Sequence, residues 1–486
     1  MRQGHIPVKV ARTELDWHDP LDLYEWVSDQ HPEKKAYLFE SLSGPEQDRR
    51  SAAVGWDRLA ELRVFANRVT LEAEESLRRQ IASVIEFSLG HEREDSWPIE
   101  NRSQVWDLLR AVQQSFLLEG DLDIPGFAFG FLATFAYEAA WDMDELSPRQ
   151  RDLTTPRCTL SLFRNTVWYD LTSGGTWHLS ATSPFFPADI AEPVTPPPRS
   201  SMFPAAVKPR QVRFTVDKPA FCQWAERCLE HIRVGDIYQV QVGHRIEIDT
   251  SLSPLQVYQR LRQRNPSPYM YLLPWAGRYV IGASPELLFR IRDGHLVMRP
   301  IAGTASRAAE RAEDASRIRA LRESAKERAE HVMLVDLCRN DIGRVCVPGT
   351  LTVDAMMDVE PFSYVHHLVS TISAQLRPDT DVWSVLRATF PAGTMTGAPK
   401  LRAMQIIDEI EGASRGIYAG ALGLIDIRGE ATLALCIRTT VYENGIYHTQ
   451  ASAGVVADSS PEAEWKETLA KMGASYWALT GEELSR

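Results

Sequence analysis

The C-terminal half of the chain alternates between short apolar runs and turn-forming residues. The runs are rich in β-branched and aromatic residues, and turns such as Glu443-Asn444-Gly445 join neighbouring runs. This pattern predicts antiparallel strands connected by tight turns. The predicted strands cover residues 238–248, 269–273, 278–281, 287–291, 420–427, 434–442 and 446–451.

Longer segments between these strands carry apolar residues at helical spacing. The best case is a single helix over 313–339, in which Leu321 and Ala325 belong to a stripe of apolar residues three or four apart. Further helices are expected over 398–410 and 461–479. Antiparallel strands with intervening helices indicate an α+β fold with helices covering the sheets.

A proline-rich stretch interrupts the chain between residues 184 and 210. Proline lacks the backbone donor that helices and sheets use, so the stretch favours neither. We interpret it as a linker, with a long ordered surface loop as the alternative. The chain then divides into an N-terminal region, residues 1–183, the linker, residues 184–210, and a C-terminal region, residues 211–486.

Composition and charge exclude several classes of protein. Hydrophobic residues make up 44% and charged residues 24% of the 486 residues, which is typical of globular chains. The formal net charge of −12 disfavours a phosphate backbone as a general partner, so we expect no nucleic-acid binding.

The sequence also predicts a cytoplasmic protein without a membrane segment. No apolar run reaches the roughly 18 residues that a membrane-spanning helix needs, and the N-terminus lacks the apolar core of a signal peptide. The six cysteines are scattered without a CxxC pair, which argues against zinc sites and disulfide frameworks.

Two stripes of charged residues lie at helical spacing. Glu323, Glu327 and Glu330 stand at i, i+4 and i+7, while Glu464 and Glu467 precede a lysine on the last predicted helix. Taken singly, each stripe is typical of a solvated helix face. If both faced one cleft, the carboxylates would need a cation between them, and oxygen ligands suit Mg²⁺.

Two glycine-containing turns could hold an anion through their backbone donors. Residues 390–400 form a small-residue turn before a helix, and residues 451–454 follow a strand. The first is not a phosphate-binding P-loop, because the lysine-hydroxyl pair of that motif is absent. Structural turns remain the alternative for both.

Five segments carry a family resemblance in order and spacing, between Phe214 and about Ala478. They resemble the signature blocks of the chorismate-utilising enzymes, which include the large subunits of anthranilate synthase and aminodeoxychorismate synthase. The resemblance implies an α+β fold of large, mostly antiparallel β-sheets packed as a sandwich with helices outside. The segments are 299–304, 330–341, 365–370, 393–400 and 453–458.

The resemblance implies which residues bind chorismate, a ring that carries two carboxylates. Magnesium would bind one carboxylate and orient the ring, and fixed positive charges and backbone donors would hold the remaining oxygens. The implied metal ligands are Glu327, Glu330, Glu464 and Glu467. The implied substrate-binding residues are Tyr418, Arg438, Ala453, Gly454 and Lys471.

The resemblance also implies the catalytic residues. Glu286 matches the acid that donates a proton to the departing C4 hydroxyl, and a carboxyl group in a closed acidic site should have a raised pKa. His367 matches the histidine associated with the later elimination of pyruvate. Thr396, in the fourth block, is the third catalytic candidate.

Two positions bear on the nucleophile. Members that add water have a lysine base where this chain has Gln239, which cannot deprotonate water. Members that aminate at C4 often have a nucleophilic lysine where this chain has Ala302, beside Gly303 and Thr304. The resemblance therefore implies that ammonia adds directly at C2, followed by pyruvate loss to give anthranilate, as in anthranilate synthase component I of tryptophan biosynthesis.

The N-terminal region resembles the aminating members more weakly. Residues 38–41 and 265–270 match the elements that form the tryptophan feedback site in that family. Tryptophan is therefore a candidate inhibitor of this chain. The candidate effector contacts are Glu40, Ser41, Pro268, Tyr269 and Met270.

Several alternatives stay open at this stage. Residues 359–371 read more like the C4-aminating aminodeoxychorismate enzyme, and Thr432, Leu433 and Ser452 replace residues usual in the family. A product that keeps its pyruvate, 2-amino-2-deoxyisochorismate, is therefore a second alternative, and a non-catalytic tryptophan-sensing or glutaminase-binding subunit is a third. No glutaminase segment is evident, so the resemblance implies ammonia from a separate glutamine amidotransferase subunit.

Overall fold

The computed structural model describes residues 5–31, 35–120, 126–143, 152–186, 196 and 203–484. Most of the predicted linker lies outside these residues, so the division of the chain stays a prediction. All strand pairings between named strands of this part are antiparallel except the one between β1 (Ile6–Glu14) and β6 (Phe116–Leu118). The antiparallel sheets expected from the alternating pattern are thereby confirmed.

The strands form two layers that join where β3 and β8 pair along their lengths. The first layer contains β3 (Ser51–Val64), β2 (Ala36–Glu40), β12 (Tyr269–Trp275), β13 (Arg278–Ser284), β22 (Thr439–Glu443), β23 (Ile446–Val455), β11 (Gln239–Asp249) and β10 (Gln211–Phe214) in pairing order. The second contains β8 (Cys158–Asp170), β7 (Gly130–Phe135), β20 (Ala421–Asp426), β21 (Ala431–Leu435), β14 (Leu287–Arg292), β15 (His295–Met298), β18 (Val365–Gln375), β16 (Ile301–Ser306) and β17 (Thr352–Pro361).

Short strands complete the sheet edges. They are β9 (Thr176–Thr182) beside β1 and β8, β4 (Arg68–Ala73) beside β3, β5 (Trp97–Pro98) beside β4, and β19 (Gly397–Ala398) beside β11. Because β2 pairs with β12 and β7 pairs with β20, the N-terminal and C-terminal regions share both layers.

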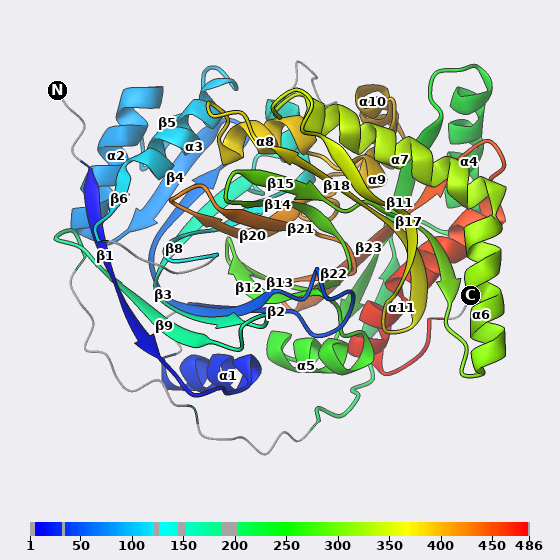
Figure 1. The fold of residues 1–486 in the computed structure, drawn as a ribbon, viewed down its shortest axis with the longest axis horizontal. Helices are drawn as coiled ribbons and strands as arrows, with labels where there is room; N and C mark the ends of the chain where they lie inside the picture. The colour runs from blue at the N-terminus through cyan, green and yellow to red at the C-terminus, as the bar shows by residue number, and fades with distance from the viewer. Residues whose placement is uncertain are drawn as a thin grey trace.

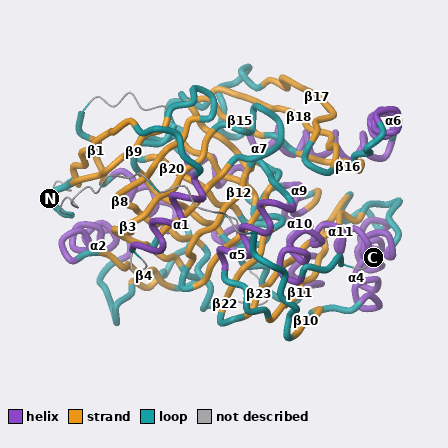
Figure 2. The backbone as a smooth tube through the Cα atoms, turned by 90° about the horizontal axis from the view of Figure 1, so that it is seen from below, coloured by secondary structure: helices purple, strands orange, loops and turns teal. Residues whose placement is uncertain are grey.

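Helices cover the outer face of each layer, as Figure 1 shows. The first layer packs against α1 (Pro20–Gln30), α4 (Lys218–Arg233), α5 (Pro254–Arg264), α10 (Lys400–Glu411) and α11 (Pro461–Thr480). The second packs against α2 (Glu75–Leu89), α3 (Gln104–Gln114), the 3-10 helix Tyr137–Asp142, α7 (Ala325–Gly343) and α8 (Val382–Thr389). α6 (Arg311–Glu323) extends beyond the sheets beside β16 and β17 (Figure 2), and α9 (Gly393–Thr396) is a single turn.

A third apolar cluster fills the space between the two layers. Tyr37 and Leu273 come from the first layer, while Leu132, Phe163 and Leu422 come from the second. Side chains from the inner faces of two sheets therefore interdigitate, as in other β-sandwiches. The predicted α+β sandwich with outer helices is confirmed.

The single helix predicted over 313–339 is wrong, because Ser324 ends α6 and starts α7. Its hydroxyl accepts a hydrogen bond from the Glu327 backbone N–H at 3.3 Å, which satisfies one of the free donors at the start of α7. Glu323 therefore belongs to α6 and does not continue the stripe of Glu327 and Glu330.

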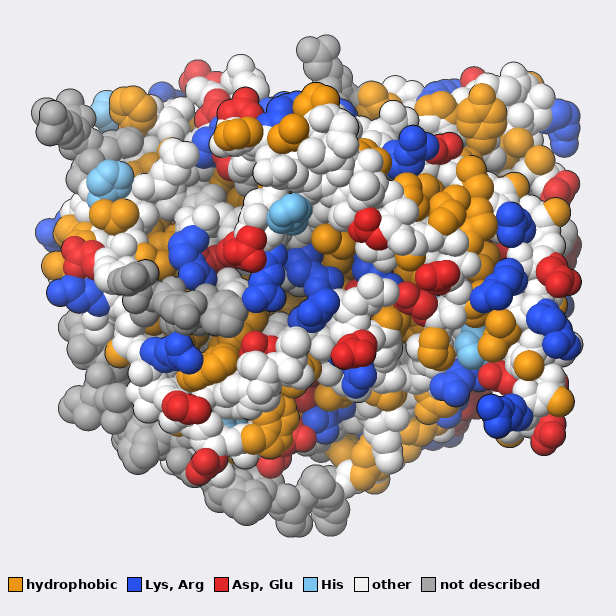
Figure 3. Space-filling view, in the orientation of Figure 1, with side chains coloured by type: hydrophobic (Ala, Val, Ile, Leu, Met, Phe, Trp, Pro, Cys, Tyr) orange, Lys and Arg blue, Asp and Glu red, His pale blue; other side chains and the backbone are white. Residues whose placement is uncertain are grey.

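The surface carries both acidic and basic side chains. Figure 3 shows acidic and basic side chains interspersed over one face of the molecule, so the net charge of −12 is not concentrated there. No helix in the described part of the chain combines the length and apolar character needed to cross a membrane.

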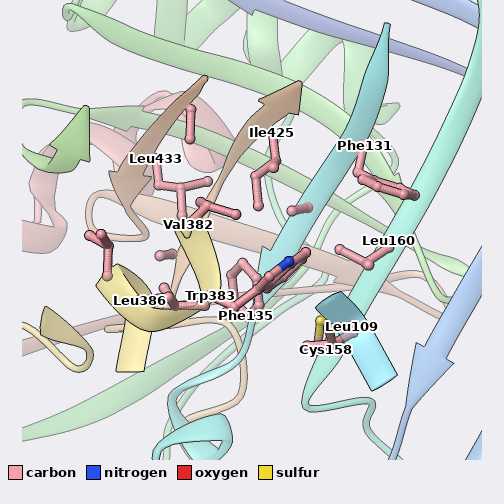
Figure 4. Packing of buried hydrophobic residues seen from close by; sticks show 14 of the residues in the cluster. Leu109, Phe131, Phe135, Cys158, Leu160, Val382, Trp383, Leu386, Ile425 and Leu433 are labelled. Carbon is pink, nitrogen blue, oxygen red and sulfur yellow. The ribbon is translucent and has the colours of Figure 1, made fainter. Parts of the chain in front are cut away.

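Trp383 of α8 lies in the apolar core between the second layer and the helices that cover it. It lies next to Phe135 and Leu386 in Figure 4, is completely buried, and donates its indole N–H to Gln113 Oε1 at 2.6 Å. Removal of a large buried aromatic side chain leaves a cavity that the surrounding residues fill only in part.

We expect Trp383→Ala to lower the free energy of unfolding by about 3–5 kcal/mol. Urea unfolding followed by fluorescence and circular dichroism measures the change. Phe87→Ala is the matched control, because Phe87 is 82% exposed. Equal unfolding midpoints for the two variants would contradict the assignment of Trp383 to the core.

Candidate active site

A cavity of about 710 Å³ lies where the ends of several strands meet α7 and α11. Segments far apart in the sequence form its walls, so its composition depends on the sandwich topology. Most of the residues predicted for the site line it: Glu286, Ala302, Gly303, Thr304, Glu327, Glu330, His367, Tyr418, Arg438, Gly454, Glu464, Glu467 and Lys471.

Glu286 lies in the turn between β13 and β14 and is buried. Thr394 donates a hydrogen bond to its Oε1 at 2.9 Å, and the backbone N–H of Leu435 donates to its carbonyl at 3.0 Å. Burial raises the pKa of the Glu286 carboxyl to about 8, because the charged form loses its hydration. The group is therefore mostly protonated at neutral pH and can donate a proton.

His367 of β18 lies opposite Thr304 of β16. Its Nδ1 is 3.1 Å from the carbonyl oxygen of Gly303 and 3.0 Å from the Thr304 hydroxyl. Burial, followed by the nearby Arg438, lowers the pKa of His367 to about 3. Since a carbonyl oxygen only accepts, Nδ1 carries the proton of the neutral ring and Nε2 keeps a free lone pair.

Arg438 interrupts the predicted strand over 434–442. The chain instead forms β21 and β22, with Arg438 between them in the left-handed region at φ 52°. A residue other than glycine rarely adopts this left-handed conformation, and here it interrupts the strand. The interruption places Arg438 at the cavity wall, where burial lowers the pKa of its guanidinium.

Four carboxylates from two helices face the same cavity. Burial, together with the neighbouring Glu327 and Glu467, raises the pKa of Glu330 to about 7. Glu464 has a buried Oε2 without a hydrogen-bond partner in the described part of the chain. The carboxylates of the two helices therefore line one shared cavity.

The carboxylates are not arranged as a closed metal cage. Gln239 donates a hydrogen bond to Glu330 Oε1 at 2.7 Å, and Lys471 forms an ion pair with Glu467 at 2.7 Å. Among the described residues, no three His, Cys, Asp or Glu side chains group tightly enough to hold a metal ion. The magnesium assignment stays a prediction.

Ser452, where the family usually has glycine, is part of a buried polar group at the cavity wall. Its hydroxyl lies 2.7 Å from the Tyr418 hydroxyl and donates to Gln241 Oε1 at 3.1 Å. Lys471 donates to the Ser452 carbonyl at 2.9 Å. The serine thus connects three residues that line the cavity.

Three of the predicted site residues do not line the cavity. The Thr396 hydroxyl is buried and donates to the Ala392 carbonyl at 3.0 Å, so it does not face the cavity, and its catalytic role stays a prediction. Gln239 lies behind the wall, where it contacts Glu330. Ala453 is buried on the other face of β23, because side chains alternate along a strand.

Two important site residues were missed from the sequence. Thr394, which contacts Glu286, stands two positions before Thr396 in the same turn, and nothing in the sequence tells the two hydroxyls apart. Gln241 stands two positions after Gln239 on the same face of β11, so strand alternation could have identified it.

A second cavity, of about 340 Å³, lies between the two layers. All five candidate effector residues line it: Glu40, Ser41, Pro268, Tyr269 and Met270. Thr432 also lines this cavity, and Leu433 is buried in the core. These two departures from the family pattern therefore lie away from the large cavity, and of the three only Ser452 adjoins it.

The Glu40 carboxyl already has hydrogen-bond partners within the protein. It accepts hydrogen bonds from Tyr258 and, at 2.9 and 3.0 Å, from Arg262. Burial nevertheless raises its pKa. The Ser41 hydroxyl donates to the Pro268 carbonyl at 2.6 Å, and Tyr269 donates to Asp48 at 2.9 Å.

Comparison with known proteins gives relatives over nearly the whole chain. The chain is 45% identical to the 2-amino-4-deoxychorismate synthase of Streptomyces globisporus over 98% of each protein. It is 34% identical to anthranilate synthase component 1 of Acinetobacter calcoaceticus, covering 98% of this chain and 96% of the relative.

Structural comparison agrees with these relatives. The crystal structure of anthranilate synthase component I from Streptococcus pneumoniae TIGR4 superimposes with a TM-score of 0.71 at 26% identity, covering 88% of this chain and 92% of that one. The family model described as chorismate binding enzyme matches residues 35–476. The chain therefore belongs to the chorismate binding enzyme family and is an enzyme that acts on chorismate.

Proposed function

We propose that this enzyme aminates chorismate at ring carbon 2, releases the C4 hydroxyl as water, and keeps the enolpyruvyl group. The product is 2-amino-4-deoxychorismate, which is also called 2-amino-2-deoxyisochorismate. The observation that carries the proposal is the buried acid Glu286 in a cavity whose wall offers no lysine nucleophile at position 302. The overall reaction is chorismate plus ammonia giving the amine plus water.

Glu286 supplies the proton that the departing hydroxyl needs. A hydroxyl leaves as water only when it is protonated, and an acid with a pKa of about 8 holds its proton at neutral pH. The C4–O bond breaks, the proton of Glu286 goes to the oxygen, and Glu286 becomes a carboxylate. The Thr394 hydrogen bond stabilises that carboxylate.

The side chains near the ring favour ammonia at C2. Ala302 offers no nitrogen for a covalent intermediate, and Gln239 offers no base to activate water. Ammonia carries its own lone pair and needs no base to attack. The nitrogen lone pair forms the new bond to C2, both ring double bonds shift, and the electron pair of the C4–O bond leaves with the water. The proton that the new ammonium group loses restores the acid form of Glu286.

A product that retains the enolpyruvyl group agrees with the name of the relative that is 45% identical. Anthranilate, the product that we first expected, agrees with it less well. The name of that Streptomyces globisporus enzyme describes a chorismate with an amino group on carbon 2 and no oxygen on carbon 4. Ser452, bound to Tyr418 and Gln241, is the departure from the family pattern that adjoins the cavity. The proposal therefore replaces our first expectation of anthranilate.

Anthranilate synthesis is the second candidate. His367 lies in the cavity with a neutral ring and a free Nε2, so a base is available to remove the C2 proton during loss of pyruvate. The relative from Acinetobacter calcoaceticus also has that activity in its name. The two candidates differ only in whether this last elimination occurs.

The acidic residues fit a magnesium ion. Glu327 and Glu330 from α7 and Glu464 and Glu467 from α11 bring like charges into one cavity. Burial, followed by Glu327 and Glu467, raises the pKa of Glu330. Oxygen ligands with room for water are those that Mg²⁺ prefers. When bound, the ion would neutralise a carboxylate of chorismate, and Lys471 would have to release Glu467.

The ammonia source and the inhibitor are further parts of the proposal. A separate glutamine amidotransferase subunit would supply ammonia, as is typical of aminating members of this family. The cavity between the layers is large enough for a small aromatic ligand, and tryptophan is the candidate, although Glu40 would have to exchange its bonds with Arg262.

The first prediction from the proposed function concerns the product formed from chorismate, Mg²⁺ and ammonium chloride. We expect an amine that retains the enolpyruvyl mass in mass spectrometry, with little or no pyruvate in a lactate dehydrogenase assay. Equimolar pyruvate with fluorescent ortho-aminobenzoate would instead support the second candidate. An amine that a lyase converts to para-aminobenzoate would contradict amination at C2.

The second prediction concerns pH dependence. Turnover needs protonated Glu286, so kcat/KM for chorismate should fall as the pH rises through about 8. Thr394→Val removes a hydrogen bond that stabilises the carboxylate, which raises the pKa and should move this fall about one pH unit higher. Saturating ammonium at each pH keeps the supply of nucleophile from limiting the rate.

Two variants complete this test. Thr394→Ser keeps the hydroxyl and should behave like the wild type. Glu286→Gln should lower kcat by roughly 10²–10⁴-fold, since general acid catalysis is lost. A fall at the same pH in Thr394→Val and wild type would show that another group titrates.

A further inference from the structure

The hydroxyl of Ser452 lies between two other side chains of the large cavity. Ser452 is buried, its oxygen is 2.7 Å from the Tyr418 hydroxyl, and it donates to Gln241 Oε1 at 3.1 Å. All three residues line the large cavity. A serine hydroxyl has one proton, and here that proton goes to Gln241. The hydrogen bond between Tyr418 and Ser452 is therefore donated by the phenol.

The Tyr418 side chain is held in this direction from behind. The Arg415 guanidinium lies 5.8 Å from the centre of its ring, and Arg415 is itself bound to Glu411 at 2.7 Å and to the Gln241 carbonyl at 2.8 Å. Burial raises the pKa of the Tyr418 phenol, so the phenol keeps its proton at neutral pH. Tyr418 is therefore a fixed, neutral donor whose one proton already has an acceptor within the protein.

Loss of pyruvate from the aminated ring needs both a base and a donor. The base removes the proton on C2, those electrons form the double bond between C2 and C3, and the C3–O bond breaks. The electron pair of that bond stays on the departing oxygen, which leaves readily only when it receives a proton or a hydrogen bond. The products are the aromatic amine and enolpyruvate, which then tautomerises to pyruvate.

The large cavity contains a group for each role. His367 has a neutral ring with a free Nε2, which can accept the C2 proton. Tyr418 has a neutral hydroxyl on the wall of the same cavity, but its proton is bound to Ser452. A donor that must first break such a bond gains less from the departing oxygen, so the transition state for pyruvate loss is stabilised less. Pyruvate loss is therefore slow even though a base is present.

We propose that Ser452 keeps the enolpyruvyl group on the product by binding the Tyr418 hydroxyl proton. The inference rests on the proposed function, because it explains how the amine escapes before pyruvate is lost. Ser452 is a positioning residue, since it acts on the reaction through Tyr418. Without the Ser452 hydroxyl, the Tyr418 proton passes to the departing oxygen, and the proton that His367 takes from C2 returns to the phenolate.

Removal of the serine hydroxyl tests the proposal. Ser452→Ala takes away the acceptor of the Tyr418 proton. The full chain is incubated with chorismate, Mg²⁺ and ammonium chloride, lactate dehydrogenase measures pyruvate, and mass spectrometry measures the amine that keeps the enolpyruvyl group. We expect the ratio of pyruvate to this amine to rise at least about tenfold, because a hydrogen bond to a charged oxygen changes a rate by roughly 10–100-fold.

Three further variants make the result decisive. Ser475→Ala is the matched control, because Ser475 is equally buried and its hydroxyl has no hydrogen-bond partner in the described part of the chain, so the wild-type ratio should persist. Ser452→Gly also lacks the hydroxyl and should raise the ratio, which covers a failure of Ser452→Ala to fold. Tyr418→Phe added to Ser452→Ala removes the released donor and should restore the wild-type ratio.

The ratio of the two products separates this role from a merely structural one. Loss of packing at Ser452 would lower both products together and leave their ratio unchanged, and that result would overturn the proposal. A raised ratio that persists in the double variant would also overturn it, because Tyr418 would then not be the donor. If the wild type itself releases pyruvate in step with amine formation, the proposed function fails, and this is seen before any variant is compared.

Discussion

Burial of carboxyl groups in one cavity is the constraint on which the chemistry of this enzyme depends. A carboxylate that leaves water loses hydration, so its pKa rises unless a positive partner replaces the water. Glu286 has no such partner within its hydrogen bonds and keeps its proton. Glu330 shares its surroundings with two further glutamates, which is the basis of the proposed cation site.

The two sheet layers impose this burial. Their inner faces pack together, while outer helices α7 and α11 bring carboxylates from opposite ends of the catalytic region to one cavity. Irregular positions then orient individual groups. Arg438 breaks a strand in a left-handed conformation, and Gly303 causes a bulge opposite His367. Some protein groups at the substrate cavity thus come from interruptions of regular structure, where side chains can leave the alternating pattern.

Local sequence patterns were sufficient to predict much of the fold and many residues of the site. Alternating apolar runs identified β11 to β14, β20 and β23 but not β15 to β19, and the family resemblance pointed to many of the residues that line the large cavity. The helix break at Ser324 was missed, because alanine and glutamate continue the helical composition across it. The break at Arg438 was missed because the flanking residues are good strand formers.

Long-range contacts could not be obtained from the sequence. Nothing local indicates that Thr394, and not Thr396, reaches Glu286, since the choice depends on how a one-turn helix sits against the β13–β14 turn. The same is true of Ser452, whose three partners come from different segments. The register of β11 against β23, which places Gln241 opposite Gly454, is likewise a property of the folded sheet.

The central claim is that the carboxylates of α7 and α11 form one cation site next to a protonated Glu286. The most direct measurement is a crystal structure of the enzyme with chorismate and Mn²⁺ in place of Mg²⁺, with the ion located by anomalous scattering. The account predicts one ion bound by Glu330 and Glu467 together, with Lys471 released from Glu467. An ion bound elsewhere, or chorismate bound in the large cavity without any ion, would contradict it.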